Sequence, residues 1–158
     1  MMMKIPKLPF GLTLPRLVLL IVGIVYLISG LGSTAFWTLK VSGNEIFVPF
    51  GLSTFRSLDW PMSDFVLIFC CFFAAFHAVF NTSKAAMGCK VGGFAFIVQG
   101  ILGFYIDSSP ETREQFGIER KELQEAFLNF WFIGWGSFTV WVGYAGLQWL
   151  SKFQTQDI

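Results

Sequence analysis

Residues 16–37 read RLVLLIVGIVYLISGLGSTAFW, and the architecture of the chain follows from what this segment can form. After Arg16 the segment contains no charged residue. A helix needs about 20 predominantly apolar residues to cross the hydrocarbon core of a bilayer. The segment is therefore predicted to be a membrane-spanning helix. A secretory signal is the alternative interpretation, but the apolar run is too long and no small-residue cleavage site follows it.

The composition of the whole chain agrees with a membrane environment. Of its 158 residues, 54% are hydrophobic, 18% are aromatic and 13% are charged, whereas soluble domains carry about 25% charged residues. So little polar cover excludes a soluble globular enzyme and a disordered tail. The net charge of +1 provides no basic field for a phosphate backbone, so we expect no nucleic-acid partner.

Three further apolar segments are expected to cross the membrane. We therefore predict an all-α, polytopic membrane protein, a four-transmembrane-helix bundle that forms one domain over residues 1–158. Its spans are expected at about residues 16–37, 64–80, 87–106 and 126–150. The connecting segment 38–62 is unusually apolar for a loop and is predicted to lie on the membrane surface or to cap the bundle. A short polar helix is expected before Gly117.

The distribution of basic residues predicts the orientation of the bundle, because cytoplasmic segments of membrane proteins carry an excess of Lys and Arg. One side of the predicted bundle holds both termini and the 81–90 turn. Its basic residues are Lys4, Lys7, Arg16, Lys84, Lys90 and Lys152, with Asp157 as its one acid. The other side holds five basic residues among nine acidic ones. We therefore expect both termini to be cytoplasmic and the outer face to be acidic.

Glycine spacing within the expected spans predicts close helix packing. Lipid gives helices no hydrophobic drive to associate, so contacts favour small residues that let backbones approach. The glycines expected to pack helices together are Gly23, Gly30, Gly88, Gly92, Gly100, Gly136 and Gly143. Packing within the bundle is the first interpretation, and docking onto another subunit is the second.

Three residues are candidates for binding a cofactor. His77, the only histidine, lies near one end of an expected span, and an ionisable residue there suggests a functional site. It can ligate a chlorophyll magnesium or a shared haem, serve a proton or quinone site, or form a structural hydrogen bond. Trp135 and Trp141 lie deeper than an interfacial aromatic belt requires. They can stack on a lipid, carotenoid, quinone or porphyrin.

The sequence contains no arrangement that predicts a catalytic or metal site. Glu119, Glu122 and Glu125 share one helix face, which basic residues interrupt, so a solvated surface is expected there. A membrane di-iron centre requires Glu-x-x-His pairs, which one distant histidine cannot complete. The three cysteines form no C-x-x-C motif. No nucleophile is followed by a base and an orienting group, and no metal-ligand spacing is found.

The segment from Arg16 to Ser33 resembles the first span of DoxX-like four-helix membrane proteins, which also open with an arginine and end the apolar run in small residues. Arg56 and the Asp107-x-x-Pro110 motif are similar to those of a related group of small bacterial membrane proteins. The chain departs from the DoxX-like pattern because Ser33 and Thr34 stand where a lysine is expected. The resemblance implies a four-helix fold and a link to quinone or thiosulfate oxidation, but it matches no catalytic residue.

These observations predict a non-catalytic integral membrane protein with several spans, in a bacterial inner membrane or an organelle or cell membrane. We expect a small subunit, or an assembly or stabilising factor, of a larger photosynthetic or respiratory complex, with the lipid bilayer and other membrane subunits as its partners. The alternatives are a DoxX-like component of a quinone- or redox-linked enzyme, and a pigment-binding subunit that uses His77.

Overall fold

The computed structural model describes residues 12–41, 61–108 and 122–155. Every element within these ranges is helical, which confirms the predicted all-α class for this part of the chain. The elements are α1 (Leu14–Val41), α3 (Pro61–Val79), α4 (Ala85–Ser108), α6 (Glu122–Trp141), the π-helix η2 (Val142–Gly146) and α7 (Leu147–Thr155). Most of the apolar loop predicted at 38–62 and the polar helix predicted before Gly117 lie outside the described residues.

The helix boundaries differ from the predicted spans at several ends. Helix α1 continues to Val41, beyond the expected end at residue 37, and α3 begins at Pro61 rather than at residue 64. Proline suits the first position of a helix, because its ring fixes φ near the helical value and no N–H is needed there. The predicted span 126–150 is covered by three successive elements, α6, η2 and α7.

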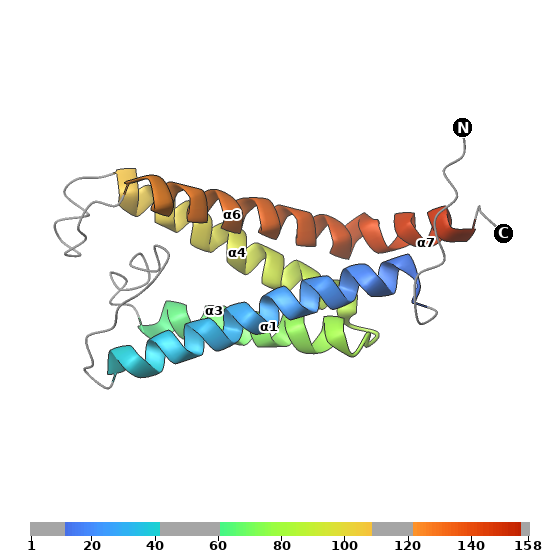
Figure 1. The fold of residues 1–158 in the computed structure, drawn as a ribbon, viewed down its shortest axis with the longest axis horizontal. Helices are drawn as coiled ribbons and strands as arrows, with labels where there is room; N and C mark the ends of the chain where they lie inside the picture. Colours follow the sequence, from blue (N-terminus) through green and yellow to red (C-terminus); the bar gives the residue numbers. More distant parts are fainter. Residues whose placement is uncertain (1–11, 42–60, 109–121, 156–158) are drawn as a thin grey trace.

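The helices form two antiparallel pairs (Figure 1). Helix α1 packs along α3, α4 packs along α6, and the two pairs meet mainly between α3 and α4. The pairs approach each other at the end that holds the start of α1, the turn between α3 and α4, and helix α7 (Figure 1). They diverge toward the opposite end, so that α1 and α6 draw apart along their length.

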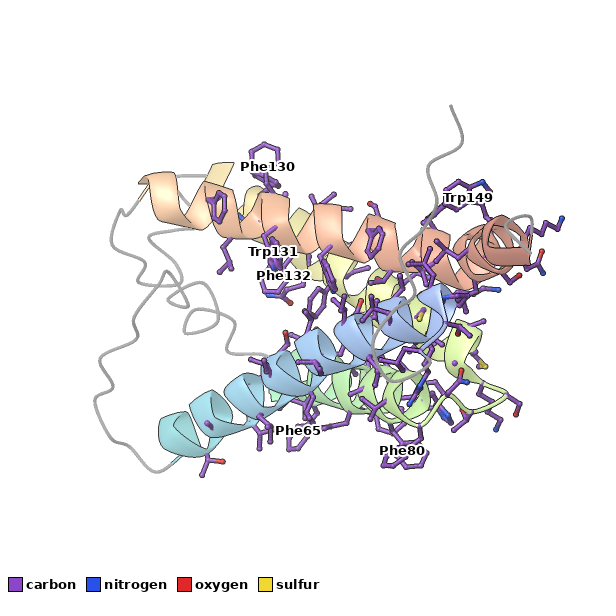
Figure 2. The ribbon with its side chains drawn as sticks, turned by 45° about the vertical axis from the view of Figure 1, so that its right-hand side comes forward. Phe65, Phe80, Phe130, Trp131, Phe132 and Trp149 are labelled. Atoms are coloured by element: carbon purple, nitrogen blue, oxygen red, sulfur yellow. The ribbon has the colours of Figure 1, made fainter. Side chains whose placement is uncertain are left out.

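Among the residues that the structure describes, two segments are long and apolar enough to cross a membrane, namely Leu14–Ala35 in α1 and Ala85–Tyr105 in α4. The apolar part of α3, Phe65–Val79, is shorter. Large apolar side chains cover the outside of the bundle, and Phe65, Phe80 and Phe130 project away from it in Figure 2. Length and composition therefore agree with membrane crossing for two of the four predicted spans.

A close contact between helix backbones joins α4 and α6. A Cβ atom placed on Gly136 would lie 2.6 Å from the carbonyl oxygen of Gly93, and one on Gly93 would lie 2.6 Å from the carbonyl oxygen of Gly136. The same position on Gly93 lies 2.7 Å from the Thr139 hydroxyl oxygen. Only two glycines allow these backbones to approach so closely.

The structure places each of the seven glycines expected to pack helices against another part of the same chain. Their nearest neighbours are Val79 for Gly23, Cys71 for Gly30, His77 for Gly88, Ala74 for Gly92, Ile133 for Gly100, Gly93 for Gly136 and Ala86 for Gly143. Two other glycines, Gly32 and Gly134, have no atom within 4 Å of an added Cβ. These seven glycines therefore face other parts of the same chain within the described bundle.

A buried hydrogen-bond chain joins the two helix pairs. The Thr139 hydroxyl donates to the carbonyl oxygen of Gly136 over 3.0 Å. Because its single proton is used there, the Tyr26 hydroxyl must donate to the Thr139 oxygen, 2.7 Å away. The Tyr26 ring also packs on Phe96, with ring centroids 4.8 Å apart. Tyr26 therefore connects α1 to both helices of the other pair.

We expect Gly136→Ala to lower the free energy of unfolding by about 1–3 kcal/mol, the usual cost of forcing extra atoms into a packed core. The added methyl group meets the backbone of Gly93, which cannot rotate away. Gly134→Ala, in the same helix, is the matched control, since its methyl group enters open space and alanine is the better helix former. Thermal unfolding in mild detergent, followed by circular dichroism, measures both variants. Equal effects of the two substitutions would contradict the proposed backbone contact.

Candidate functional site

His77 lies in the last turn of α3, where its ring is held on several sides. The ring packs edge-on against Phe73 and Phe76, with centroid separations of 4.4 Å and 5.3 Å. Its Nδ1 atom shares a 2.6 Å hydrogen bond with the Thr82 hydroxyl. The side chain is half-buried, and the turn that follows α3 fixes its orientation.

That turn is a Schellman motif, which ends α3 by satisfying its last carbonyl groups. Asn81 adopts a left-handed conformation with φ of 48°, which asparagine tolerates better than most residues. The Thr82 N–H donates to the carbonyl oxygen of His77, and the Asn81 N–H donates to that of Ala78. This pairing is the one expected at such a helix end.

Arg16 completes the end of α3 from the neighbouring helix. Its guanidinium group donates to the carbonyl oxygen of Ala78 over 3.1 Å and to that of Val79. A cation at this position also interacts favourably with the negative end of the helix dipole. The arginine that opens the first apolar run therefore joins α1 to α3.

The geometry at His77 leaves one ring nitrogen for ligation. With Nδ1 held by Thr82, Nε2 is the atom that can face a metal ion or a substrate, and a hydrogen bond on the other nitrogen is the usual support for a ligating histidine. Within the described ranges, no three His, Cys, Asp or Glu side chains are grouped closely enough to hold a metal ion. His77 can thus provide one axial ligand, or it can act only to hold the turn.

An unbroken series of aromatic rings follows α6 into α7. Trp131 and Trp135 are nearly parallel at 11°, with centroids 5.6 Å apart. Trp135 is followed by Phe138 at 5.4 Å, Phe138 by Trp141 at 6.1 Å, and Trp141 by Trp149 at 6.3 Å. We call these five residues the tryptophan ladder. It contains both tryptophans that the sequence marks as candidates for binding a cofactor.

The indole nitrogen of Trp135 is a buried polar atom of the ladder that lacks a hydrogen-bond partner. Its Nε1 is buried and makes no hydrogen bond in the described structure. Beside it, Trp131 is 46% exposed and points from α6 toward the region where the two helix pairs diverge (Figure 2). A buried donor without an acceptor costs about 1–3 kcal/mol. A carbonyl oxygen of an apolar, planar molecule could accept this hydrogen bond while its ring stacks on Trp131.

The π-helix η2 lies next to the part of the ladder formed by Trp141 and Trp149. Gly146 lies under the Trp141 ring, where an added Cβ would be 2.9 Å from a ring carbon. Gly143, in the same five-residue element, would meet the Ala86 carbonyl oxygen at 2.6 Å. π-helical turns are rare and often occur at functional sites. Here Gly143 lets η2 pack closely on α4. Gly146 leaves space for the Trp141 ring, which lies along the helix toward Trp149.

The structure does not bring the three predicted cofactor residues into one site. His77 contacts phenylalanines of its own helix and the turn after α3, whereas Trp135 and Trp141 belong to the ladder on α6. Residues that sequence reasoning missed are Arg16, Tyr26 and Thr139, which bond across helices. The aromatic spacing of three and four residues from Trp131 to Phe138 is a helical signal that indicates a continuous ladder.

No protein family model matches the chain, and no similar curated protein or solved structure was found. The resemblance to DoxX-like proteins therefore stays a prediction that rests on the sequence between Arg16 and Ser33 and on the motifs near Arg56 and Asp107. The function has to be argued from the contacts and surfaces of the chain.

The hydrogen bond between His77 and Thr82 can be measured by a double-mutant cycle. His77→Phe keeps the aromatic packing and Thr82→Val keeps the shape of the side chain. We expect each to lower the free energy of unfolding by about 0.5–1.5 kcal/mol, the usual contribution of one hydrogen bond. The double variant should cost less than the sum, since both changes remove the same interaction. Strictly additive losses would show that the bond contributes nothing.

The same pair separates a structural role from ligation. If Nε2 holds a pigment, Thr82→Val retains the visible absorbance of the purified protein and His77→Phe loses it. If His77 only holds the turn, the two variants give the same spectrum.

Proposed function

We propose that the protein is a small, non-catalytic integral membrane subunit, or an assembly or stabilising factor, of a larger photosynthetic or respiratory complex. In this proposal the chain crosses the membrane four times and both termini lie on the cytoplasmic side. The proposal is supported by the two apolar helices of sufficient length, by the apolar outer surface and by one exposed face of α6 on which a glycine and a serine lie between aromatic residues.

This face of α6 is the observation that carries the proposal. Its residues recur at intervals of three and four, the spacing that aligns side chains on one side of a helix, and all five are exposed. They are Phe127, Phe130, Gly134, Ser137 and Trp141, and we call them the outer seam. The two small residues stand at its centre with large aromatic residues on both sides.

The shape of the outer seam suits a partner helix. A Cβ on Gly134 would meet nothing within 4 Å, so this glycine is not required by packing inside the chain. Glycine in a helix interior costs about 1 kcal/mol relative to alanine. Small residues let a second transmembrane helix approach closely, and the flanking aromatic rings would then pack around it. The chain therefore has glycines that pack its own core and, separately, Gly134 on its surface.

Charge supports the proposed orientation. Four of the five basic residues in the described ranges lie toward the end of the bundle that holds the start of α1 and helix α7, namely Arg16, Lys84, Lys90 and Lys152, and Lys40 lies near the other end. The acidic residues of the same ranges lie toward the other end, at the start of α3, the end of α4 and the start of α6. The positive-inside rule assigns the basic end to the cytoplasm.

An apolar cofactor is the second candidate, favoured by the unpartnered Nε1 of Trp135. A quinone or a chlorophyll carries a carbonyl group that can accept from this donor, and its ring can stack on Trp131. This candidate includes the quinone-linked role that the DoxX-like resemblance implies. A carotenoid without oxygen would use the stacking surface alone.

Assembly through the outer seam predicts a selective loss of partners. We expect Gly134→Leu to reduce copurifying membrane subunits by tenfold or more while the variant remains folded, because its side chain enters open space in the free chain. Gly32→Leu is the matched control, since an added Cβ on Gly32 also meets nothing within 4 Å, and Gly32 lies on α1 away from the seam. The measurement is affinity purification of the tagged chain in mild detergent, with mass spectrometry of the eluate. A stable monomer with no partner in the wild type would overturn the proposal.

The second candidate is tested in the same eluate. Solvent extraction and an absorbance spectrum should reveal a quinone or a pigment in the wild type. Trp135→Phe should lower the bound amount severalfold, because it removes the indole donor and keeps an aromatic ring. Trp149→Phe, at the far end of the ladder, is expected to retain the ligand. A colourless eluate without extractable quinone excludes this candidate.

A further inference from the structure

The tryptophan ladder extends along α6 into α7, and both of its ends are exposed. Trp131 is 46% exposed at one end and Trp149 is 54% exposed at the other, where it projects outward from α7 in Figure 2. Positions 131 and 149 lie about 27 Å apart along a helix that rises about 1.5 Å per residue. The hydrocarbon core of a bilayer is about 30 Å thick. In the proposed membrane crossing, the ladder therefore joins one face of the bilayer to the other.

The contacts within the ladder suit the movement of a single electron from ring to ring. The rate of electron transfer falls steeply with distance, so rings in contact exchange electrons most readily. Indole is easily oxidised among apolar side chains, and Trp131 and Trp135 are stacked with centroids 5.6 Å apart. Phenylalanine is much harder to oxidise, and Phe138 lies between Trp135 and Trp141 at 5.4 Å and 6.1 Å. Phe138 is therefore a bridge that an electron crosses without stopping.

The buried indole nitrogen of Trp135 favours onward transfer. Loss of one electron makes the N–H group of an indole strongly acidic, and the resulting radical cation loses its proton wherever an acceptor is present. The Nε1 atom of Trp135 is buried and has no hydrogen-bond partner in the described structure. The proton therefore stays on Trp135, and the positive charge passes to the next ring in place of being trapped.

The α7 end of the ladder provides the surroundings in which the charge can come to rest. Trp149 lies beside the exposed polar residues Gln148 and Ser151, where water can accept the Nε1 proton. Tyr144 is the competing ring in η2, but the Lys90 Nζ atom lies 3.9 Å from its centroid. A cation so close disfavours the removal of an electron from that ring, because like charges repel. Trp149 is therefore the favoured end point.

We infer that the tryptophan ladder conducts single oxidising equivalents from Trp131 to Trp149. The oxidant is a planar pigment radical cation, which takes one electron from Trp131 and returns to its neutral form. Each following tryptophan then reduces the one before it. Trp149 releases its Nε1 proton to water and becomes a neutral radical, which one electron and one proton from a water-soluble thiol restore. The inference rests on the proposed function only for the membrane crossing and needs no protein partner.

A tethered photo-oxidant tests the inference on the full-length protein in mild detergent. Phe127, which is 72% exposed and lies one turn before Trp131, is replaced by cysteine and labelled with a ruthenium polypyridyl complex. Cys70→Ala removes the partly exposed native thiol, whereas Cys71 and Cys89 are buried and escape labelling. A laser flash with a dissolved electron acceptor oxidises the ruthenium centre. Transient absorption and electron paramagnetic resonance then measure the indolyl radical.

We expect a long-lived neutral indolyl radical in the labelled protein. Trp141→Phe and Trp149→Phe should each lower its yield severalfold, because the charge no longer reaches a place where the proton can leave. Phe138→Trp should raise the yield, because it replaces the ring that is hardest to oxidise. Trp37→Phe is the control, since it makes the same chemical change on α1 outside the ladder, and it should leave the yield unchanged.

Two outcomes overturn the inference. A yield that Trp141→Phe and Trp149→Phe leave unchanged shows that the charge stays where it is formed, and the lack of any indolyl radical shows that the ladder accepts none. If circular dichroism shows that Trp141→Phe does not fold, Phe138→Trp decides the question, since rings that only pack predict no gain. The measurement uses the isolated chain, so the absence of copurifying subunits contradicts the proposed function and leaves this result standing.

Discussion

The backbone contact between Gly93 and Gly136 is the constraint on which the rest of the bundle depends. In an apolar solvent, helices gain nothing by hiding apolar side chains from their surroundings, so association relies on close packing and on polar contacts between helices. The two glycines bring α4 and α6 together at van der Waals distance. Glycines also lie at other main helix contacts, with Gly23 between α1 and α3 and Gly92 between α4 and Tyr26. Backbone proximity at these glycines therefore contributes to holding the bundle together.

Close packing of the backbones also makes the polar contacts possible. An alanine at position 93 would occupy the space of the Thr139 hydroxyl group, which links Tyr26 to the carbonyl oxygen of Gly136. In the same way, Gly103 makes room for the amide of Asn129, whose buried side chain lies over it. The buried side chains of Thr139 and Asn129 therefore both depend on a glycine of the facing helix. Stability and hydrogen bonding are coupled, because losing the small residue displaces the bonded side chain.

The all-helical class and the expectation of close glycine contacts both follow from local rules that the sequence displays. Apolar runs such as residues 16–37 specify helices, and small residues at regular intervals specify close approach. The π-helix at 142–146 could not be predicted, since nothing in the local sequence pattern distinguishes it from the α-helices before and after it. The role of Arg16 was also hidden, because its acceptors lie more than 60 residues away along the chain. From the sequence, His77, Trp135 and Trp141 could be predicted only as single candidate residues. The arrangement of the two tryptophans into a ladder required the helix geometry.

Two glycines of α6 show how one helix can serve both the fold and its surroundings. Gly134 and Gly136 are two residues apart, which places them about 200° apart around a helix with 3.6 residues per turn. Gly136 faces the backbone of α4, whereas Gly134 faces open space. Only the first is required by the fold of the chain itself. Gly134 lowers the helix propensity of α6 and does not improve packing within the chain. A contact with a molecule outside the chain can offset that cost, because the glycine leaves space for it. This reasoning separates the surface that stabilises the protein from the surface that we propose to join it to a complex.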